Sequence, residues 1–250
     1  FLEIMRLLRA PGGCPWDREQ THGSIRRNFL EETYEVLDAI DHDDAHGMCE
    51  ELGDVLMQVA FHAQIEAERG RFTMADVVNG VAQKLVYRHP HVFGDVQADT
   101  SQQVLNNWEV LKRREKGQRS TADAVESVPH TLPALWRAEK IQKKARKAGF
   151  DWPDVSGALD KLSEEVEELR TAVAEGSNIQ EELGDLLFAA VNVSRFVQVD
   201  PEDALSGACD KFARRFRQVE QSAAERGQAL EHMTLAEMDK LWDAAKEHEA

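Results

Sequence analysis

The sequence predicts an all-α protein made of two tandem helical bundles, on three observations. Strong helix formers, chiefly Ala, Leu, Glu, Lys, Gln and Arg, dominate the 250 residues. Apolar residues recur at steps of three and four, as they do from Leu52 to Ala60 and from Leu183 to Val191. No segment shows the alternation of a half-buried strand, and Pro and Gly fall between the periodic runs, where helices end.

Five short blocks occur twice in the same order, which indicates an internal duplication. The pairs are residues 30–35 and 163–168, 51–56 and 182–187, Lys84/Arg88 and Lys211/Arg215, Trp108/Lys112 and Trp242/Lys246, and, more weakly, 13–17 and 149–153. One such match would arise by chance, but five in order at a nearly constant offset indicate two copies of one domain.

The segment between the two copies has the composition of a linker. Residues Gly117 to Pro133 are rich in Gly, Ser, Thr, Asp and Pro. We therefore expect a helical domain over 1–118, a linker over 119–133 and a second helical domain over 134–250, whose first turn begins near Leu135.

The charge of the chain excludes some classes of partner. The net charge of −16 argues against a general nucleic-acid binder, because phosphate backbones require a surplus of Lys and Arg. We find no apolar run long enough to span a bilayer and no stretch that resembles a secretion signal, so we expect no membrane partner and a cytoplasmic location. A small anionic substrate remains possible if divalent cations bridge carboxylates to phosphates.

Carboxylates in the second copy have the spacing of a shared helix face. Glu165 and Glu168 are three residues apart, and Glu164 lies four before Glu168. Glu182 and Asp185 repeat the three-residue spacing on the next helix. The intervening residues 175–178 read as a turn, so the two helices should be antiparallel neighbours whose carboxylates converge.

Such a cluster predicts a site for a hard divalent cation. Unpaired carboxylates repel one another, whereas Mg²⁺ prefers oxygen ligands and shares them among carboxylates, waters and phosphates. Neither carboxylate motif contains Cys or His, which argues against zinc and against the Glu-x-x-His pairs of a di-iron bundle, although Mn²⁺ is a possible substitute. The first copy offers a matching candidate set of metal ligands: Glu32, Glu35, Glu51 and Asp54.

The competing interpretation is a solvated acidic face, because Glu pairs at helical spacing are common on surfaces. Gly53 and Gly184 favour function, since a glycine inside a helix costs roughly 1 kcal/mol relative to alanine. Their presence at matching positions predicts that something approaches the helix backbone closely there.

Basic residues downstream are suited to phosphate. Lys211 and Arg215 are one helical turn apart, and Arg offers a planar fork for phosphate oxygens. Trp242 is a candidate for stacking on a base or ribose, with a core or dimer-interface role as the alternative.

The motifs together resemble the MazG nucleotide pyrophosphohydrolase family, in its two-domain bacterial form. The resemblance rests on Glu32-x-x-Glu35 with Glu51-x-x-Asp54, on Glu165-x-x-Glu168 with Glu182-x-x-Asp185, and on the segments 13–17, 88–93 and 211–216. It extends over nearly the whole chain.

This resemblance implies an all-α bundle completed by homodimerisation. It also implies hydrolysis of ribo- and deoxyribonucleoside triphosphates between the α and β phosphates, which yields the monophosphate and pyrophosphate. By the same likeness the second copy carries the main activity. The resemblance implies that Mg²⁺ is held there by Glu165, Glu168, Glu182 and Asp185. It also implies that the nucleotide is contacted by Lys161, Glu181, Lys211, Arg215 and Trp242. Asn28 stands where the second copy has Lys161, which puts nucleotide binding by the first copy in doubt.

We hypothesise metal-assisted hydrolysis in which Glu164 or Glu165 accepts the proton of the attacking water. Glu168 belongs to the same catalytic group, and Lys211 and Arg215 stabilise charge on the phosphates. Two alternatives stay open: a helical module that binds nucleotides or an alarmone without rapid turnover, and a structural dimer with solvated acidic faces.

Overall fold

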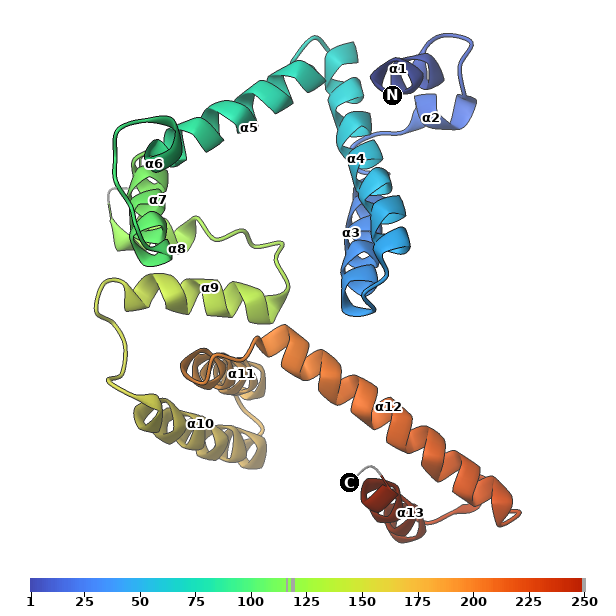
Figure 1. The fold of residues 1–250 in the computed structure, drawn as a ribbon. Coiled ribbons are helices and arrows are strands. Elements are labelled where there is room, and N and C mark those ends of the chain that lie inside the picture. The colour runs from blue at the N-terminus through green and yellow to red at the C-terminus, as the bar shows by residue number, and fades with distance from the viewer. Residues whose placement is uncertain (116, 118–119, 249–250) are drawn as a thin grey trace. The chain divides into compact units, whose positions relative to one another are not determined.

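The computed structural model describes residues 1–115, 117 and 120–248, and all regular structure within them is helical (Figure 1). The chain divides into two compact units, Phe1–Arg114 and Glu115–Ala250. The prediction of an all-α protein is confirmed for these residues.

The first unit contains seven helices and a small apolar core. That core lies between the first helix, the fourth helix and the start of the third helix. Its buried residues are Met5, Ile25, Ala60, Phe61 and Ile65. The helices of the unit are α1 (Leu2–Arg9), α2 (Pro15–Glu19), α3 (Arg26–Asp41), α4 (Ala45–Glu68), α5 (Met74–Arg88), α6 (Pro90–Phe93) and α7 (Ser101–Glu115).

The second unit has its own core, where α12 packs on α13. Val219, Ala223 and Leu241 are buried there, and Trp242 packs against them. The elements of the unit are α8 (Thr121–Glu126), α9 (Ala134–Arg146), α10 (Val155–Glu175), α11 (Ile179–Phe196), α12 (Pro201–Glu225), the 3₁₀ turn η1 (Leu230–His232) and α13 (Leu235–His248).

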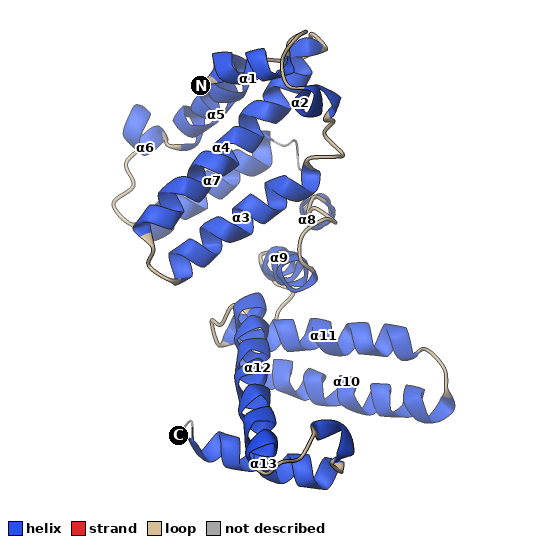
Figure 2. Ribbon diagram, turned by 90° about the vertical axis from the view of Figure 1, so that its right-hand side faces the viewer, coloured by secondary structure: helices blue, strands red, loops and turns tan. Residues whose placement is uncertain are grey.

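Each unit contains an antiparallel helical hairpin, α3–α4 in the first and α10–α11 in the second (Figure 2). The α10–α11 turn follows from local chemistry, because Gly176 and Asn178 both have positive φ, at 68° and 54°. In the α3–α4 turn Asp43 has φ 52°, and the Asp44 side chain accepts hydrogen bonds from the backbone N–H groups of His46 and Gly47. The predicted turn between the two carboxylate-bearing helices is therefore confirmed.

The segment expected to be a linker contains the short helix α8. Ser120 and Asp123 form a reciprocal capping box at its start, and Ala124 and Val128 are buried. This helix packs on α9 and belongs to the second unit, which begins at Glu115. A helix of six residues is too short to show a clear period in the sequence, and its polar residues serve as caps.

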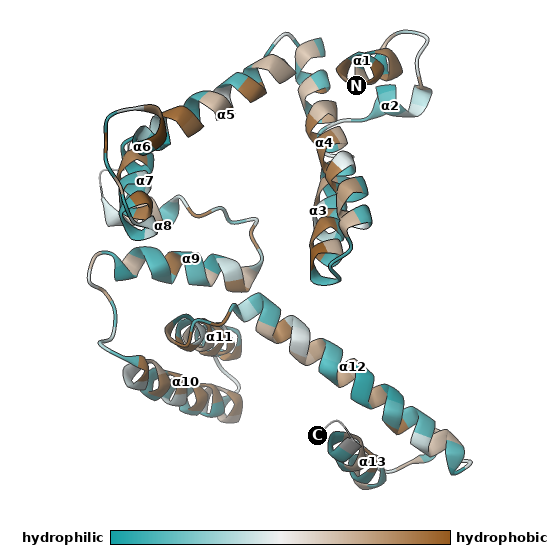
Figure 3. Cartoon of the chain, viewed as in Figure 1, coloured by the Kyte–Doolittle hydropathy of each residue, from teal (hydrophilic) through white to brown (hydrophobic). Residues whose placement is uncertain are grey.

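Apolar and polar residues are mixed along most of the helices (Figure 3). Within the described residues, no helix combines the length and the apolar character that a membrane span requires.

Candidate functional site

The α10–α11 hairpin gathers three of the predicted carboxylates. Carboxylate oxygens of Glu165, Glu168 and Glu182 lie within 4.8 Å of one another. The first two project from α10 at a three-residue spacing, and the third comes from the first turn of α11. The antiparallel hairpin thus brings together side chains from both halves of the sequence motif.

Lys161 lies one turn before these residues and contacts two carboxylates. Its Nζ lies 2.8 Å from an oxygen of Glu164 and 2.8 Å from Oε1 of Glu165. Hydrogen bonds to Glu164 and Glu165 raise the pKa of Lys161 above its usual value, so the ammonium group stays charged. The other oxygen of Glu165, Oε2, is buried and has no hydrogen-bond partner among the residues that the structure describes.

The residues of this cluster fit a divalent cation. A buried carboxylate oxygen without a partner is costly, and a cation that accepts oxygen ligands would remove that cost. Desolvation and the hydrogen bond with Glu165 raise the pKa of Glu168, while the charge of Lys161 opposes the rise. The donors in this cluster are carboxylate oxygens, the ligand type that Mg²⁺ and Mn²⁺ prefer.

The remaining predicted residues of this hairpin lie near the three carboxylates. Asp185 is one turn beyond Glu182 on α11, and it lines a pocket together with Lys161 and Glu165. Glu181 is exposed in the first turn of α11.

The first unit repeats the cluster on α3 and α4. Carboxylate oxygens of Glu32, Glu35 and Glu51 lie within 4.8 Å of one another. Desolvation, with the neighbouring carboxylates including Asp54, raises the pKa of Glu32 and that of Glu51. Asn28, half-buried on α3, stands at the position of Lys161, so the amide supplies no positive charge there.

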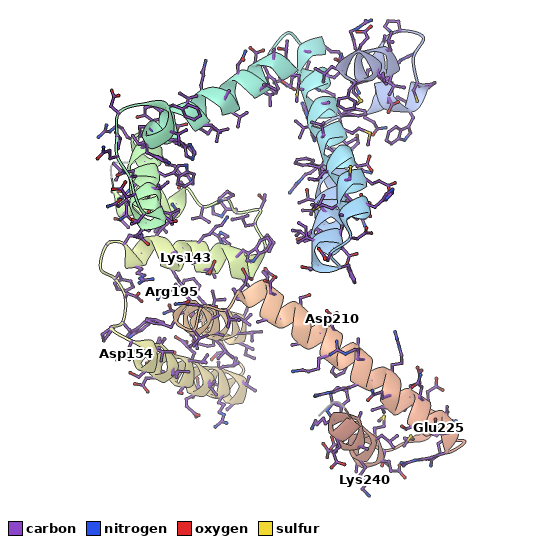
Figure 4. The ribbon with its side chains drawn as sticks, viewed as in Figure 1. Lys143, Asp154, Arg195, Asp210, Glu225 and Lys240 are labelled. Atoms are coloured by element: carbon purple, nitrogen blue, oxygen red, sulfur yellow. The ribbon has the colours of Figure 1, made fainter. Side chains whose placement is uncertain are left out.

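Two of the residues predicted to contact the nucleotide, Arg215 and Trp242, lie together in the second unit, at the contact of α12 with α13. The guanidinium carbon of Arg215 lies 5.9 Å from the centre of the Trp242 ring, and Phe212 packs on the same ring at 5.0 Å. Lys211 is exposed on α12 directly after Asp210, which Figure 4 labels. The first unit has a parallel arrangement, in which Arg88 and Lys112 lie 5.2 and 4.6 Å from the Trp108 ring.

Among the described residues, no atom makes the close backbone approach that was expected at Gly53 and Gly184. A methyl group built on either glycine would meet no atom within 4 Å. Both glycines lie on exposed helix surfaces, so the space beside them is open to solvent in a single chain.

Sequence reasoning missed a buried ion pair beside the hairpin. Arg195 on α11, labelled in Figure 4, donates from Nη1 to Asp151 at 2.9 Å, and its side chain is 4% exposed. It also donates to the Asn192 side chain, and the Gln142 amide donates to the backbone carbonyl of Phe188 at 2.7 Å. The sequence did contain a signal for this pair, because Arg195 continues the apolar stripe of α11 and a buried arginine requires a partner.

A family model described as the MazG nucleotide pyrophosphohydrolase domain matches residues 20–93 and again residues 154–220. Each match contains one helical hairpin with its three carboxylates.

Relatives match along the full chain. It is 46% identical over 254 residues to a nucleoside triphosphate pyrophosphohydrolase of Escherichia coli (strain K12), which covers all of this chain and 97% of the relative. It is 46% identical over 246 residues to the nucleoside triphosphate pyrophosphohydrolase/pyrophosphatase MazG of Thermotoga maritima, with coverage of 98% and 94%. A Bacillus subtilis protein, YabN, is 52% identical over 252 residues, which are all of this chain and 51% of the relative.

Proposed function

The chain belongs to the MazG nucleotide pyrophosphohydrolase family, and we propose that its second repeat cleaves nucleoside triphosphates between the α and β phosphates with bound Mg²⁺. At the level of the family, the chain is a nucleoside triphosphate pyrophosphohydrolase, a hydrolase that acts on acid anhydrides. The finer proposal adds the metal, the repeat that carries the activity, and the acceptance of both ribo- and deoxyribonucleotides.

One observation carries the proposal: oxygens of three carboxylates lie within 4.8 Å of one another, and Oε2 of Glu165 is buried with no hydrogen-bond partner in the described part of the chain. We assign Glu165, Glu168, Glu182 and Asp185 as the residues that would hold Mg²⁺, with Mn²⁺ as a substitute. When bound, the metal supplies neutralisation of the triphosphate charge and lowers the pKa of a bound water.

The remaining steps belong to side chains of the hairpin. Lys161 holds the carboxylates of Glu164 and Glu165 in place through its two 2.8 Å contacts. A carboxylate in this position suits the removal of a proton from the attacking water, and we assign that step to Glu164 or Glu165. The pKa of Lys161 is raised by these carboxylates, so the ammonium also balances part of their charge.

Lys211 and Arg215 are proposed to stabilise charge on the leaving pyrophosphate. Arg215 is half-buried and lies over the Trp242 ring, so its fork is held in one orientation. Both residues lie on α12, and we propose that the active site is completed in a homodimer, where a second chain adds to the open side of the hairpin.

Exposed apolar side chains support the homodimer. Leu183, Leu187 and Phe188 on α11 are 46, 50 and 42% exposed, and the space beside Gly184 is open. Apolar surface of this kind, contiguous along one helix, is typical of a protein–protein contact. Sedimentation at micromolar concentration tests this point: we expect a dimer, and a fully active monomer would contradict it.

The decisive experiment for the enzymatic proposal is a panel of ribo- and deoxyribonucleoside triphosphates with product identification, with and without Mg²⁺. We expect the monophosphate and pyrophosphate from every member of the panel, and only when Mg²⁺ or Mn²⁺ is present. Release of inorganic phosphate and a diphosphate would contradict the proposed cleavage position. Tight binding without pyrophosphate release would favour a regulatory nucleotide-binding module instead.

A further inference from the structure

Two histidines in the first unit form a contact that the proposed chemistry does not use. His22 lies in the 20–25 segment between α2 and α3, and His62 lies on α4. Their Nδ1 atoms are 2.7 Å apart, and the two ring planes are nearly parallel, at 13°. A centroid separation of 5.0 Å leaves one ring radius on each side of this contact, so the line through the two nitrogens also passes through both ring centres.

This in-line geometry is that of a hydrogen bond. The lone pair or the N–H group of an imidazole nitrogen points outward from the ring, so one proton lies between His22 and His62. A metal ion held in line by the same two nitrogens would separate them by about 4 Å, since a Zn–N bond is about 2.0 Å long. The observed distance of 2.7 Å is too short for a bridging cation, so one ring donates to the other.

Glu66 determines which ring is the donor. Its carboxylate contacts Nε2 of His22 at 2.5 Å and forms a bidentate pair with Arg71. The hydrogen bond with His22 and the contact with Arg71 hold the pKa of the Glu66 carboxyl below its usual value, against the effect of burial. Because an ionised carboxylate accepts and cannot donate, Nε2 of His22 carries a proton, and Nδ1 of the neutral ring is an acceptor. His62 therefore donates from Nδ1, and its own Nε2 is unprotonated.

Positive charge close to Glu66 disfavours further protons on the two rings. Arg69 and Arg71, which follow α4, both contact the Glu66 carboxylate. The negative charge next to His22 is therefore already balanced by guanidinium groups. Desolvation and the neighbouring His22 lower the pKa of His62.

Two other helices pack on α4 near this position. From α3, Phe29 turns its ring edge-on to the His62 ring, with the centroids 5.9 Å apart. On α1, Arg9 forms its own ion pair with Glu68 at 2.8 Å. The carboxylate that contacts the two histidines is thus Glu66, which already faces two guanidinium groups.

The geometry limits how many protons the two rings can hold. One additional proton can enter at Nε2 of His62 without disturbing the hydrogen bonds, but a second would turn two N–H groups toward each other at 2.7 Å. Two separated histidines both take up a proton near pH 6.5. A released 20–25 segment therefore binds more protons than the attached one. The contact is fully stable above about pH 6.5 and weakens as the pH falls below that value.

We propose that the His22–His62 contact is a pH-sensitive latch, which holds the 20–25 segment against α4 near neutral pH and releases it as the solution becomes acidic. The segment is suited to move as one piece, because Thr21 and Ser24 each donate a backbone N–H to the hydroxyl of the other, at 2.9 and 3.2 Å. The His22 side chain is 37% exposed, so protons from solvent reach the contact. The latch does not depend on the proposed function, since its residues lie outside both carboxylate clusters.

Hydrogen–deuterium exchange of the full chain at pH 7.5 and 5.5 tests the latch. After correction for the intrinsic exchange rate, we expect protection of the backbone N–H groups of residues 20–25 to fall roughly tenfold, the change that one extra bound proton produces over one pH unit. His62→Asn keeps a donor for Nδ1 of His22 and does not titrate, so its protection should change by less than about twofold. His130→Asn, at an exposed histidine of the second unit, is the matched control and should behave as the natural chain does.

Equal losses of protection in the natural chain and in His62→Asn, or no loss in the natural chain, would overturn the proposal. A second measurement needs no variant, because long-range proton–nitrogen correlation spectra identify the protonated nitrogen of each ring. At pH 7.5 we expect the proton at Nε2 of His22 and at Nδ1 of His62. A proton at Nε2 of both rings would exclude the in-line hydrogen bond, and the latch with it.

Discussion

The two hairpins share a backbone arrangement and differ in how their carboxylates are balanced. Each brings three Glu side chains within 4.8 Å, two from the first helix and one from the second. In α10–α11 the ammonium of Lys161 pairs with Glu164 and Glu165, whereas Asn28 stands at that position in α3–α4. Duplication has therefore preserved the geometry of the cluster, while the position of Lys161 carries a positive charge in the second hairpin and a neutral amide in the first.

The largest expected contrast is the loss of activity on neutralising one carboxylate in each repeat. Glu168→Gln removes a proposed metal ligand, and we expect kcat/KM to fall by roughly 100-fold or more. Glu35→Gln, the matched change in the first repeat, should alter it by less than about twofold. Steady-state assays of pyrophosphate release measure both, with far-UV circular dichroism as the check on folding.

Equal losses in the two variants would show that both repeats contribute to turnover. Full activity in Glu168→Gln would contradict the assignment of the site to the second hairpin.

The second contrast compares a buried ion pair with an exposed one. Arg195→Met removes the guanidinium that pairs with the largely buried Asp151 and leaves the more exposed Arg146, at 3.4 Å, as its remaining cationic partner, so the loss of stability should be about 2 to 3 kcal/mol. Arg27→Met breaks the pair with Glu31, whose side chains are 86 and 49% exposed, so the loss should be below about 1 kcal/mol. Urea denaturation followed by fluorescence compares the two, and a larger loss for Arg27→Met would reverse the interpretation.

The third contrast exchanges the residues at position 161 of the second repeat and at the matching position 28 of the first. Lys161→Asn should raise KM for nucleoside triphosphates roughly tenfold, because it removes the proposed contact of the ammonium with the nucleotide and its hydrogen bonds to Glu164 and Glu165. Asn28→Lys places an ammonium one turn before Glu32 and should create nucleotide-dependent stabilisation in a chain that also carries Glu168→Gln. Thermal melts with Mg²⁺ and a non-hydrolysable triphosphate measure it, and an unchanged melting temperature would show that the lysine alone is insufficient.

The smallest contrast is in the pH dependence of stability. The pKa of Glu32 is raised in the folded chain, so the protonated form adds stability that is fully present below about pH 4.5 and is lost as pH rises through the folded pKa. Glu32→Gln mimics the protonated form and should raise the melting temperature at pH 7.5 without divalent cations by about 1 °C. The gain should shrink toward pH 4.5, and a gain independent of pH would exclude this cause.

Local periodicity predicted the hairpins and the carboxylate clusters, because residues three apart share a helix face regardless of tertiary context. It could not predict the Arg195–Asp151 pair, whose members are 44 residues apart in the chain, or the hydrogen bond from Gln142 to the Phe188 carbonyl, which spans 46 residues. Both depend on how α9 and the 149–153 loop pack on α11. The sequence also could not predict the short helix α8. This helix is too short to be stable alone, and it is stabilised by packing on α9, with Ala124 and the nearby Val128 buried.

The contact of Lys161 with two carboxylates has an evolutionary consequence. Asparagine and lysine codons differ only in their third base, so one nucleotide substitution separates the Asn28 state from the Lys161 state. A duplicated domain of this kind can lose or regain a charged partner in a single generation, without any change in backbone or helix length. Under the role proposed for Lys161, the identity of this one residue would sort related sequences by the number of repeats that take part in the chemistry.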